Sequence, residues 1–148
     1  MNATMEPLME KSFFIPTEDE IAGGPGEYSE EKIAEIQANL APCTGSTQYF
    51  AYNGCRLTEG AKIMAELCQA FWLFDAILSH QLSDHVRREE FQSWRLSPCK
   101  ASRGALLLAD DGNEHLLTAQ HIPYTDFPLP EGIRLYVRDG VIFLPSEY

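Results

Sequence analysis

The sequence lacks the features that mark membrane, secreted and metal-stapled proteins. It contains no apolar run of about 18 residues, and its first residues, MNATMEPLMEKSFFIP, lack the basic start and apolar centre of a secretory signal. Its four cysteines include no C-x-x-C pair, which is typical of reduced structural thiols rather than of a metal site. We therefore predict a cytoplasmic protein that does not bind a membrane.

Basic residues are also scarce. The chain has 11 lysines and arginines against 22 acidic residues, a net charge of -11, and its acids concentrate toward the N-terminus. Direct nucleic-acid binding is disfavoured, because a phosphate backbone requires a basic face. A host protein or nucleoprotein complex with a basic surface is a better electrostatic match. The acids that we predict to bind it are Glu18, Asp19, Glu20, Glu27, Glu30 and Glu31.

The length of 148 residues fits one domain with a sizeable core. Pro7, Pro16 and the Gly23-Gly24-Pro25-Gly26 run indicate an extended segment that ends in a flexible joint. We therefore divide the chain into an acidic extended arm at 1–28 and a single α+β domain at 29–148.

Two helices are predicted from capping residues and periodicity. Ser29, followed by Glu30 and Glu31, starts a short amphipathic helix over 30–40. Thr58 starts the longest periodic segment, which runs to about residue 81 and carries a broad apolar stripe. We predict that this second segment is one long central helix.

Beyond Pro98 the apolar period changes from 3.6 to 2. ALLLAD and EHLLTAQH flank Asp111-Gly112, and IRLYVR and VIFLP flank Asp139-Gly140, which predicts two hairpins. In the second, Val137 should face Ile142 and Leu135 should face Leu144. FQSWRLS (91–97) is a further strand, whereas 43–57 indicates only a turn and an irregular or strand-like stretch. The predicted fold is α+β, with the long helix packed on a four- or five-stranded antiparallel meander.

The stretch IPYTDFPLP (122–130) is the most unusual in composition. Its prolines prevent strand pairing and helix formation, and Thr125-Asp126 can hold a turn. We interpret it as the crossover between the hairpins, in which Tyr124 and Phe127 must be buried or offered to a partner. Tyr124 and Asp126 are therefore predicted to form an edge of the binding surface.

Several separated motifs carry a family resemblance. They are TGSTQY (44–49), LTEG (57–60), FWLFDAI (71–77), FQSW (91–94), IPYTDFP (122–128) and LPSEY (144–148). From about residue 43 to 148 the chain resembles a family of small proteins of bacterial genomes, plasmids and phages, classed only as a domain of unknown function. The resemblance implies no activity, cofactor or catalytic residue, and suggests at most a mobile-element setting.

Motifs that resemble catalytic or ligand sites have simpler interpretations. His80 and His85 are five apart, whereas helical metal ligands lie three or four apart. Asp110-Asp111-Gly112-Asn113-Glu114 lacks the glutamate that an EF-hand loop needs, so a hairpin turn is favoured. Thr44-Gly45-Ser46-Thr47 lacks a phosphate-binding lysine. We predict no catalytic residue, no metal and no cofactor.

These observations favour a non-enzymatic acidic interaction protein of the anti-CRISPR or anti-restriction type, which inhibits a host complex by occupying its basic nucleic-acid-binding surface. One alternative is a small enzyme with a cleft between helix and sheet that uses Asp75, His80 and a tyrosine. Another is a homo-oligomeric scaffold, such as a homodimer, joined through Tyr136 and Phe143 of the last hairpin.

Overall fold

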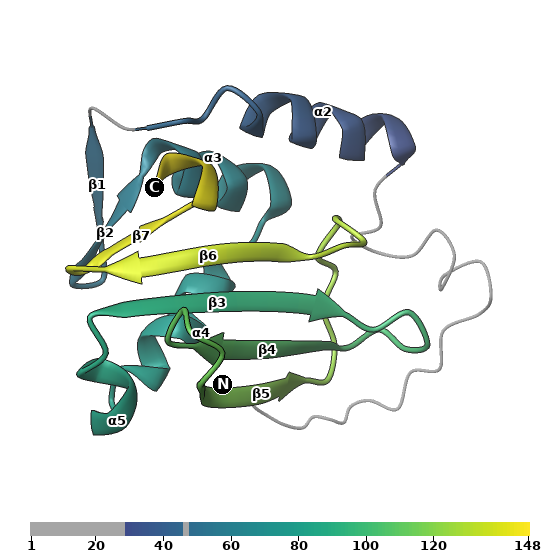
Figure 1. The fold of residues 1–148 in the computed structure, drawn as a ribbon. Helices are drawn as coiled ribbons and strands as arrows, with labels where there is room; N and C mark the ends of the chain where they lie inside the picture. The colour runs from purple at the N-terminus through teal and green to yellow at the C-terminus, as the bar shows by residue number, and fades with distance from the viewer. Residues whose placement is uncertain (1–28, 46–47) are drawn as a thin grey trace.

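The computed structural model describes residues 29–45 and 48–148. A seven-stranded sheet forms its centre, in the order β1-β2-β7-β6-β3-β4-β5 (Figure 1). All neighbouring strands are antiparallel except β2 and β7, which run parallel. The strands are β1 (Tyr49–Tyr52), β2 (Cys55–Thr58), β3 (Phe91–Pro98), β4 (Ala105–Asp110), β5 (Leu116–Ile122), β6 (Ile133–Arg138) and β7 (Val141–Phe143).

The helices are short. They are α2 (Glu30–Leu40), α3 (Glu59–Cys68), α4 (Phe71–His80), α5 (Asp84–Arg87) and the 3-10 helix η1 (Pro145–Glu147). Among the residues that the structure describes, no helix is long and apolar enough to cross a membrane.

The predicted fold class is wrong in both of its parts. The sheet is mixed and seven-stranded rather than a four- or five-stranded antiparallel meander, and the described residues contain no long central helix. The predicted helix breaks at Gln69, which adopts a left-handed conformation with φ of 53°, so that α3 and α4 are separate. The apolar stripe continues across the break because α3 and α4 both bury side chains in one core. Periodicity therefore does not reveal the interruption.

The extra strands β1 and β2 form a hairpin that the sequence analysis missed. Their turn is Asn53-Gly54, and both residues have positive φ values, 45° and 89°. Such a pair is the preferred sequence of a two-residue hairpin turn. The signal was therefore present in the stretch interpreted only as irregular or strand-like.

Several local predictions are confirmed. The first helix spans Glu30–Leu40 with Ser29 as its cap, and Thr58 caps α3 by accepting a hydrogen bond from the Ala61 N–H at 3.2 Å. In the last hairpin Val137 pairs with Ile142. Leu144 does not pair with Leu135, because β7 ends at Phe143.

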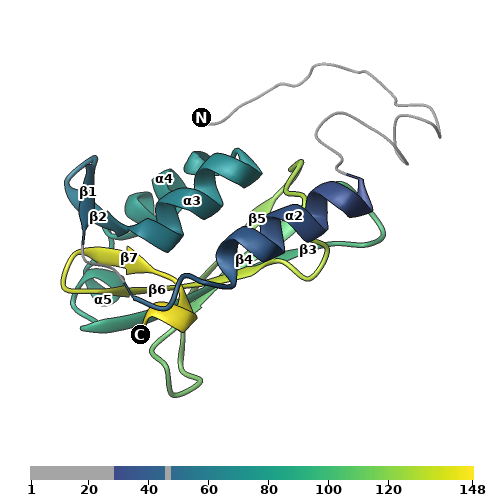
Figure 2. The same ribbon diagram turned by 90° about the horizontal axis from the view of Figure 1, so that it is seen from above.

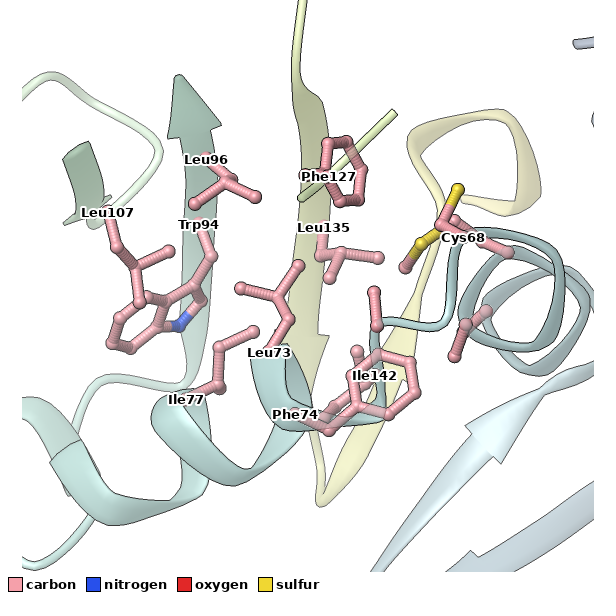
Figure 3. Close-up of a cluster of buried hydrophobic side chains, with 14 of the residues drawn as sticks. Cys68, Leu73, Phe74, Ile77, Trp94, Leu96, Leu107, Phe127, Leu135 and Ile142 are labelled. Atoms are coloured by element: carbon pink, nitrogen blue, oxygen red, sulfur yellow. The ribbon is translucent and has the colours of Figure 1, made fainter. Parts of the chain in front are cut away.

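The core lies between the sheet and helices α3 and α4, which cover the same face (Figure 2). Figure 3 shows side chains of α4 pointing into it toward Trp94 of β3 and Leu135 of β6. The α4 side chains are Leu73, Phe74 and Ile77, each at most 1% exposed. We call this side of the sheet the inner face.

The opposite side of the sheet, which Figure 1 views from the front, carries no helix of two turns or more within the described residues. We call it the open face. Because side chains alternate along a strand, it receives Phe91, Ser93 and Arg95 from β3, Arg134, Tyr136 and Arg138 from β6, and Phe143 from β7.

Candidate functional site

An aromatic cluster occupies the centre of the open face. Tyr136 lies 4.8 Å from Phe91 and 5.8 Å from Phe143, measured between ring centroids. Tyr148, which follows η1, stacks on Phe143 at 5.9 Å and also contacts Phe91 and Tyr136. Tyr148 is 72% exposed. The cluster thus presents aromatic surface of the kind that is enriched at protein interfaces.

Arginines flank this cluster at both ends. At one end Arg138 pairs with Val141 of β7, which in turn pairs with Arg56 of β2. At the other end Arg95 of β3 pairs directly with Arg134 of β6. Arg134 and Arg138 are four residues apart on one strand, so the two ends are separated by about 13 Å. The open face is therefore basic and aromatic, in contrast to the net charge of the chain.

A carboxylate fixes the C-terminal segment beside this face. Glu147 Oε1 accepts hydrogen bonds from the Thr58 hydroxyl at 2.6 Å and from the Leu144 N–H at 2.9 Å, and Oε2 accepts one from the Gly60 N–H at 3.0 Å. A Cβ at Gly60 would lie 2.7 Å from Glu147 Cδ, so a larger residue there would displace this carboxylate. A negative group is favourable at this place because it lies at the positive end of α3.

A second contact holds the same segment to the loop that follows α2. The Ser146 hydroxyl donates to the Cys43 carbonyl oxygen at 2.7 Å. The pKa of the Cys43 thiol is raised by burial and by the carboxylates of Glu147 and Glu59. A raised pKa keeps the thiol protonated, which makes Cys43 a poor nucleophile.

The structure tests only part of the predicted acidic surface. Glu18, Asp19, Glu20 and Glu27 lie outside the described residues. Glu30 and Glu31 are exposed in the first turn of α2. The only described basic residue on this helix is Lys32, whose ammonium lies 3.5 Å from Glu35. Glu30 and Glu31 form no ion pair with a described residue.

The segment 122–130 divides its two aromatics between core and surface. Phe127 is buried and its N–H bonds to the Thr125 hydroxyl at 3.1 Å, whereas Tyr124 is 53% exposed. The Arg103 guanidinium lies 5.1 Å from the Tyr124 ring, and Asp126 is half-buried. Within the described part of the chain, no hydrogen bond or ion pair joins Tyr124 or Asp126 to the acids of α2.

The two residues proposed for an enzyme do not share a site. Asp75 accepts hydrogen bonds from the Tyr52 hydroxyl at 2.8 Å and from Asn53 Nδ2 at 3.3 Å. His80 Nε2 instead lies 2.7 Å from Gln120 Oε1, and its ring packs on Trp94. Burial and the bond to Asp75 raise the pKa of Tyr52 to about 12. Tyr52 therefore stays protonated at neutral pH and acts as a hydrogen-bond donor.

The stretch considered for calcium is the loop of the β4–β5 hairpin. The Asp111 carboxylate accepts bonds from the N–H groups of Asn113 and His115 and lies 2.9 Å from His115 Nδ1. These bonds, led by that from Asn113, lower the pKa of Asp111. Across residues 29–45 and 48–148, no three His, Cys, Asp or Glu side chains are grouped to hold a metal ion.

The surface proposed for self-association is partly covered by the chain itself. Phe143 is only 7% exposed, because Tyr148 stacks over it, while Tyr136 remains half-buried. The exposed aromatic surface here therefore belongs mainly to Tyr148.

A family comparison gives these observations a context. The family of unknown function DUF6876 matches residues 34–148. The chain belongs to this family. The match confirms the resemblance drawn from the sequence motifs and begins earlier than residue 43, within α2. No curated protein and no solved structure matches the chain.

Two of the motifs that carry the family resemblance meet in space. LTEG supplies Thr58 and Gly60 at the start of α3, and LPSEY supplies the Glu147 carboxylate that binds both. The segments are about 87 residues apart in sequence. In this chain the docking of the C-terminal segment therefore joins two of these motifs, and it also places Tyr148 on the open face.

Proposed function

We propose that this protein is a non-enzymatic interaction protein whose acidic N-terminal region binds a basic surface of a partner. The observation that carries the proposal is the exposure of Glu30 and Glu31 at the start of α2, next in sequence to the acidic residues of 1–28. A sequence segment rich in carboxylates is complementary in charge to a surface that normally holds phosphates.

We infer the class of partner from the family resemblance as well as from the charge. The family resemblance suggests a mobile-element context, in which host nucleases and RNA-guided effector complexes are basic nucleic-acid-binding targets. An acidic protein that competes for such a surface inhibits by occlusion and needs no catalytic group. The separate engagement of Asp75 and His80, each by its own hydrogen-bond partner, agrees with a non-enzymatic role.

The test is binding of the full chain to purified host nucleases and RNA-guided effectors, measured over a range of salt concentrations. We expect binding that weakens as salt is raised and that displaces nucleic acid in a gel-shift assay. E30Q/E31Q should reduce the affinity, and neutralisation of Glu18, Asp19 and Glu20 as well should reduce it further.

The matched control is E90Q/E114Q, which removes two exposed acids elsewhere on the domain. It changes the net charge by the same amount as E30Q/E31Q. Equal loss in both variants, or binding that is insensitive to salt, would show that the N-terminal acids do not form the interface.

A further inference from the structure

A cavity opens where the sheet loses a strand. β7 pairs only with Tyr136–Arg138, so the first half of β6 has no strand neighbour on that side. A hollow of about 460 Å³ lies there between the start of β6, the end of α2 and the segment that follows β7. This volume is within the range of ligand pockets.

The residues that line this cavity are of two main kinds. Leu40, Ile133, Leu144 and Pro145, which we call the apolar wall, carry apolar side chains, whereas Arg95 and Arg134 are basic. Glu131 also lines it, and its Oε2 accepts a hydrogen bond from Gln37 Nε2 at 3.1 Å. The cavity therefore offers cationic donors beside an apolar surface.

The side-by-side placement of the two arginines is not offset by an ion pair within the described chain. Arg95 and Arg134 are direct cross-strand partners, an arrangement in which like charges destabilise a sheet. Within residues 29–45 and 48–148, neither guanidinium forms an ion pair with an acidic side chain. The two cations thus face each other without a direct ion pair, although the Glu131 carboxylate lines the same cavity.

One of the two arginines is also held in position. Arg134 Nη1 donates to the Ser93 hydroxyl at 2.6 Å, and Ser93 is only 4% exposed. This bond orients the planar guanidinium, whose remaining N–H groups can bind a carboxylate bidentately. Arg95 is exposed and free to close on the same ligand.

We propose that this cavity binds an acidic segment of a partner protein, with a carboxylate between Arg95 and Arg134 and a neighbouring hydrophobic side chain against Leu40, Leu144 and Pro145. The site is separate from the acidic surface of the proposed function and has the opposite charge. It extends toward Tyr136 and Tyr148, because Tyr136 lies two residues from Arg134 on the same face. Arginine and tyrosine are both enriched at interface hot spots.

Charge favours a protein carboxylate over a nucleic acid as the occupant. A nucleic acid is a long polyanion, and the net charge of -11 on the protein would repel it along its length. A short acidic segment instead interacts mainly with the arginines that it contacts. The apolar wall adds to this preference, because it matches a hydrophobic side chain rather than a phosphate.

The experiment is a selection of phage-displayed random heptapeptides on the full chain, followed by fluorescence anisotropy with the synthetic peptides. We expect enrichment of sequences in which Asp or Glu adjoins a hydrophobic residue. R95E/R134E should lower their affinity at least tenfold. R88E/K100E, which makes the same charge change at two exposed positions, should leave it unchanged.

If R95E/R134E does not fold, R95Q is used instead, because it keeps the bond between Arg134 and Ser93. It should weaken binding several-fold, with an unchanged thermal melt. The proposal is overturned if acidic sequences are not enriched, or if R88E/K100E loses affinity equally. It is also overturned if oligo-dT or inorganic phosphate binds at the arginines while the peptides do not.

Discussion

The residues on the two faces of strand β3 differ in how far packing within the domain accounts for them. On the inner face Gln92, Trp94 and Leu96 are at most 2% exposed and belong to a packed core. On the open face the same strand carries Phe91, Ser93 and Arg95, of which Arg95 is exposed beside a second arginine. Packing accounts for the first set. In the second set Phe91 packs in the aromatic cluster and Ser93 binds Arg134, whereas Arg95 forms no ion pair with a described residue.

The largest effect should come from the inner face. We expect Trp94→Ala to destabilise the domain by about 3 to 5 kcal/mol, because it leaves a large cavity in the core between α4 and the sheet. The substitution also removes the hydrogen bond that the indole N–H donates to Gln92 Oε1 at 2.9 Å. Urea unfolding followed by circular dichroism measures the change. A loss below about 1 kcal/mol would mean that Trp94 is not packed as described.

The next largest effect on stability should come from the contact that joins the C-terminal segment to the start of α3. We expect Glu147→Gln to cost about 1 to 3 kcal/mol, since hydrogen bonds from Thr58, Gly60 and Leu144 to a charged acceptor are weakened. Urea unfolding again provides the measurement.

Gly60→Ala provides a cross-check on Glu147, because the added Cβ would displace the same carboxylate. If both changes act through this contact, their effects should be less than additive in the double variant. Full additivity would contradict the assignment of Glu147 to this contact.

The fold could be predicted locally but not globally. Ser29, Thr58 and the Asp139-Gly140 turn act within a few residues, so the first helix, the start of α3 and the last hairpin were foreseen. The break at Gln69 has no glycine or proline to mark it. The parallel pairing of Arg56 with Val141 joins distant segments, and no periodicity encodes which strands are neighbours.

The candidate site was less accessible to sequence analysis for the same reason. Arg95 and Arg134 meet only because β6 pairs with β3, although β4 and β5 lie between them in the chain. The acids of the N-terminus, by contrast, are adjacent in sequence and could be recognised directly. A site assembled from strand pairing cannot be read before the strand order is known.

The pH dependence of stability tests whether the Tyr52 phenol is buried at the β1–β2 hairpin. The folded state raises its pKa from about 10 to about 12, so it favours the protonated phenol. The resulting stability is fully present below pH 10 and is lost as pH rises from 10 to 12. We expect Tyr52→Phe to flatten the fall in melting temperature over this range.

Ultraviolet titration provides an independent measurement of the Tyr52 phenol. Tyr52 should give a late ionisation phase in the wild type, and this phase should be absent in Tyr52→Phe. In Asp75→Asn it should move to lower pH, because the neighbouring charge no longer opposes ionisation. A late phase that persists in Tyr52→Phe would assign the raised pKa to another residue.

The smallest effect on stability should come from the open face. We expect Arg95→Thr to leave the free energy of unfolding unchanged or to raise it by up to about 0.5 kcal/mol, since it removes a like-charge neighbour of Arg134 and introduces a β-branched residue. Added salt should reduce any gain, because it already screens the repulsion in the wild type. Arg134→Thr should instead lose about 1 kcal/mol with its bond to the buried Ser93 hydroxyl. A loss above 1 kcal/mol for Arg95→Thr would mean that Arg95 is engaged within the chain and is not available to a partner.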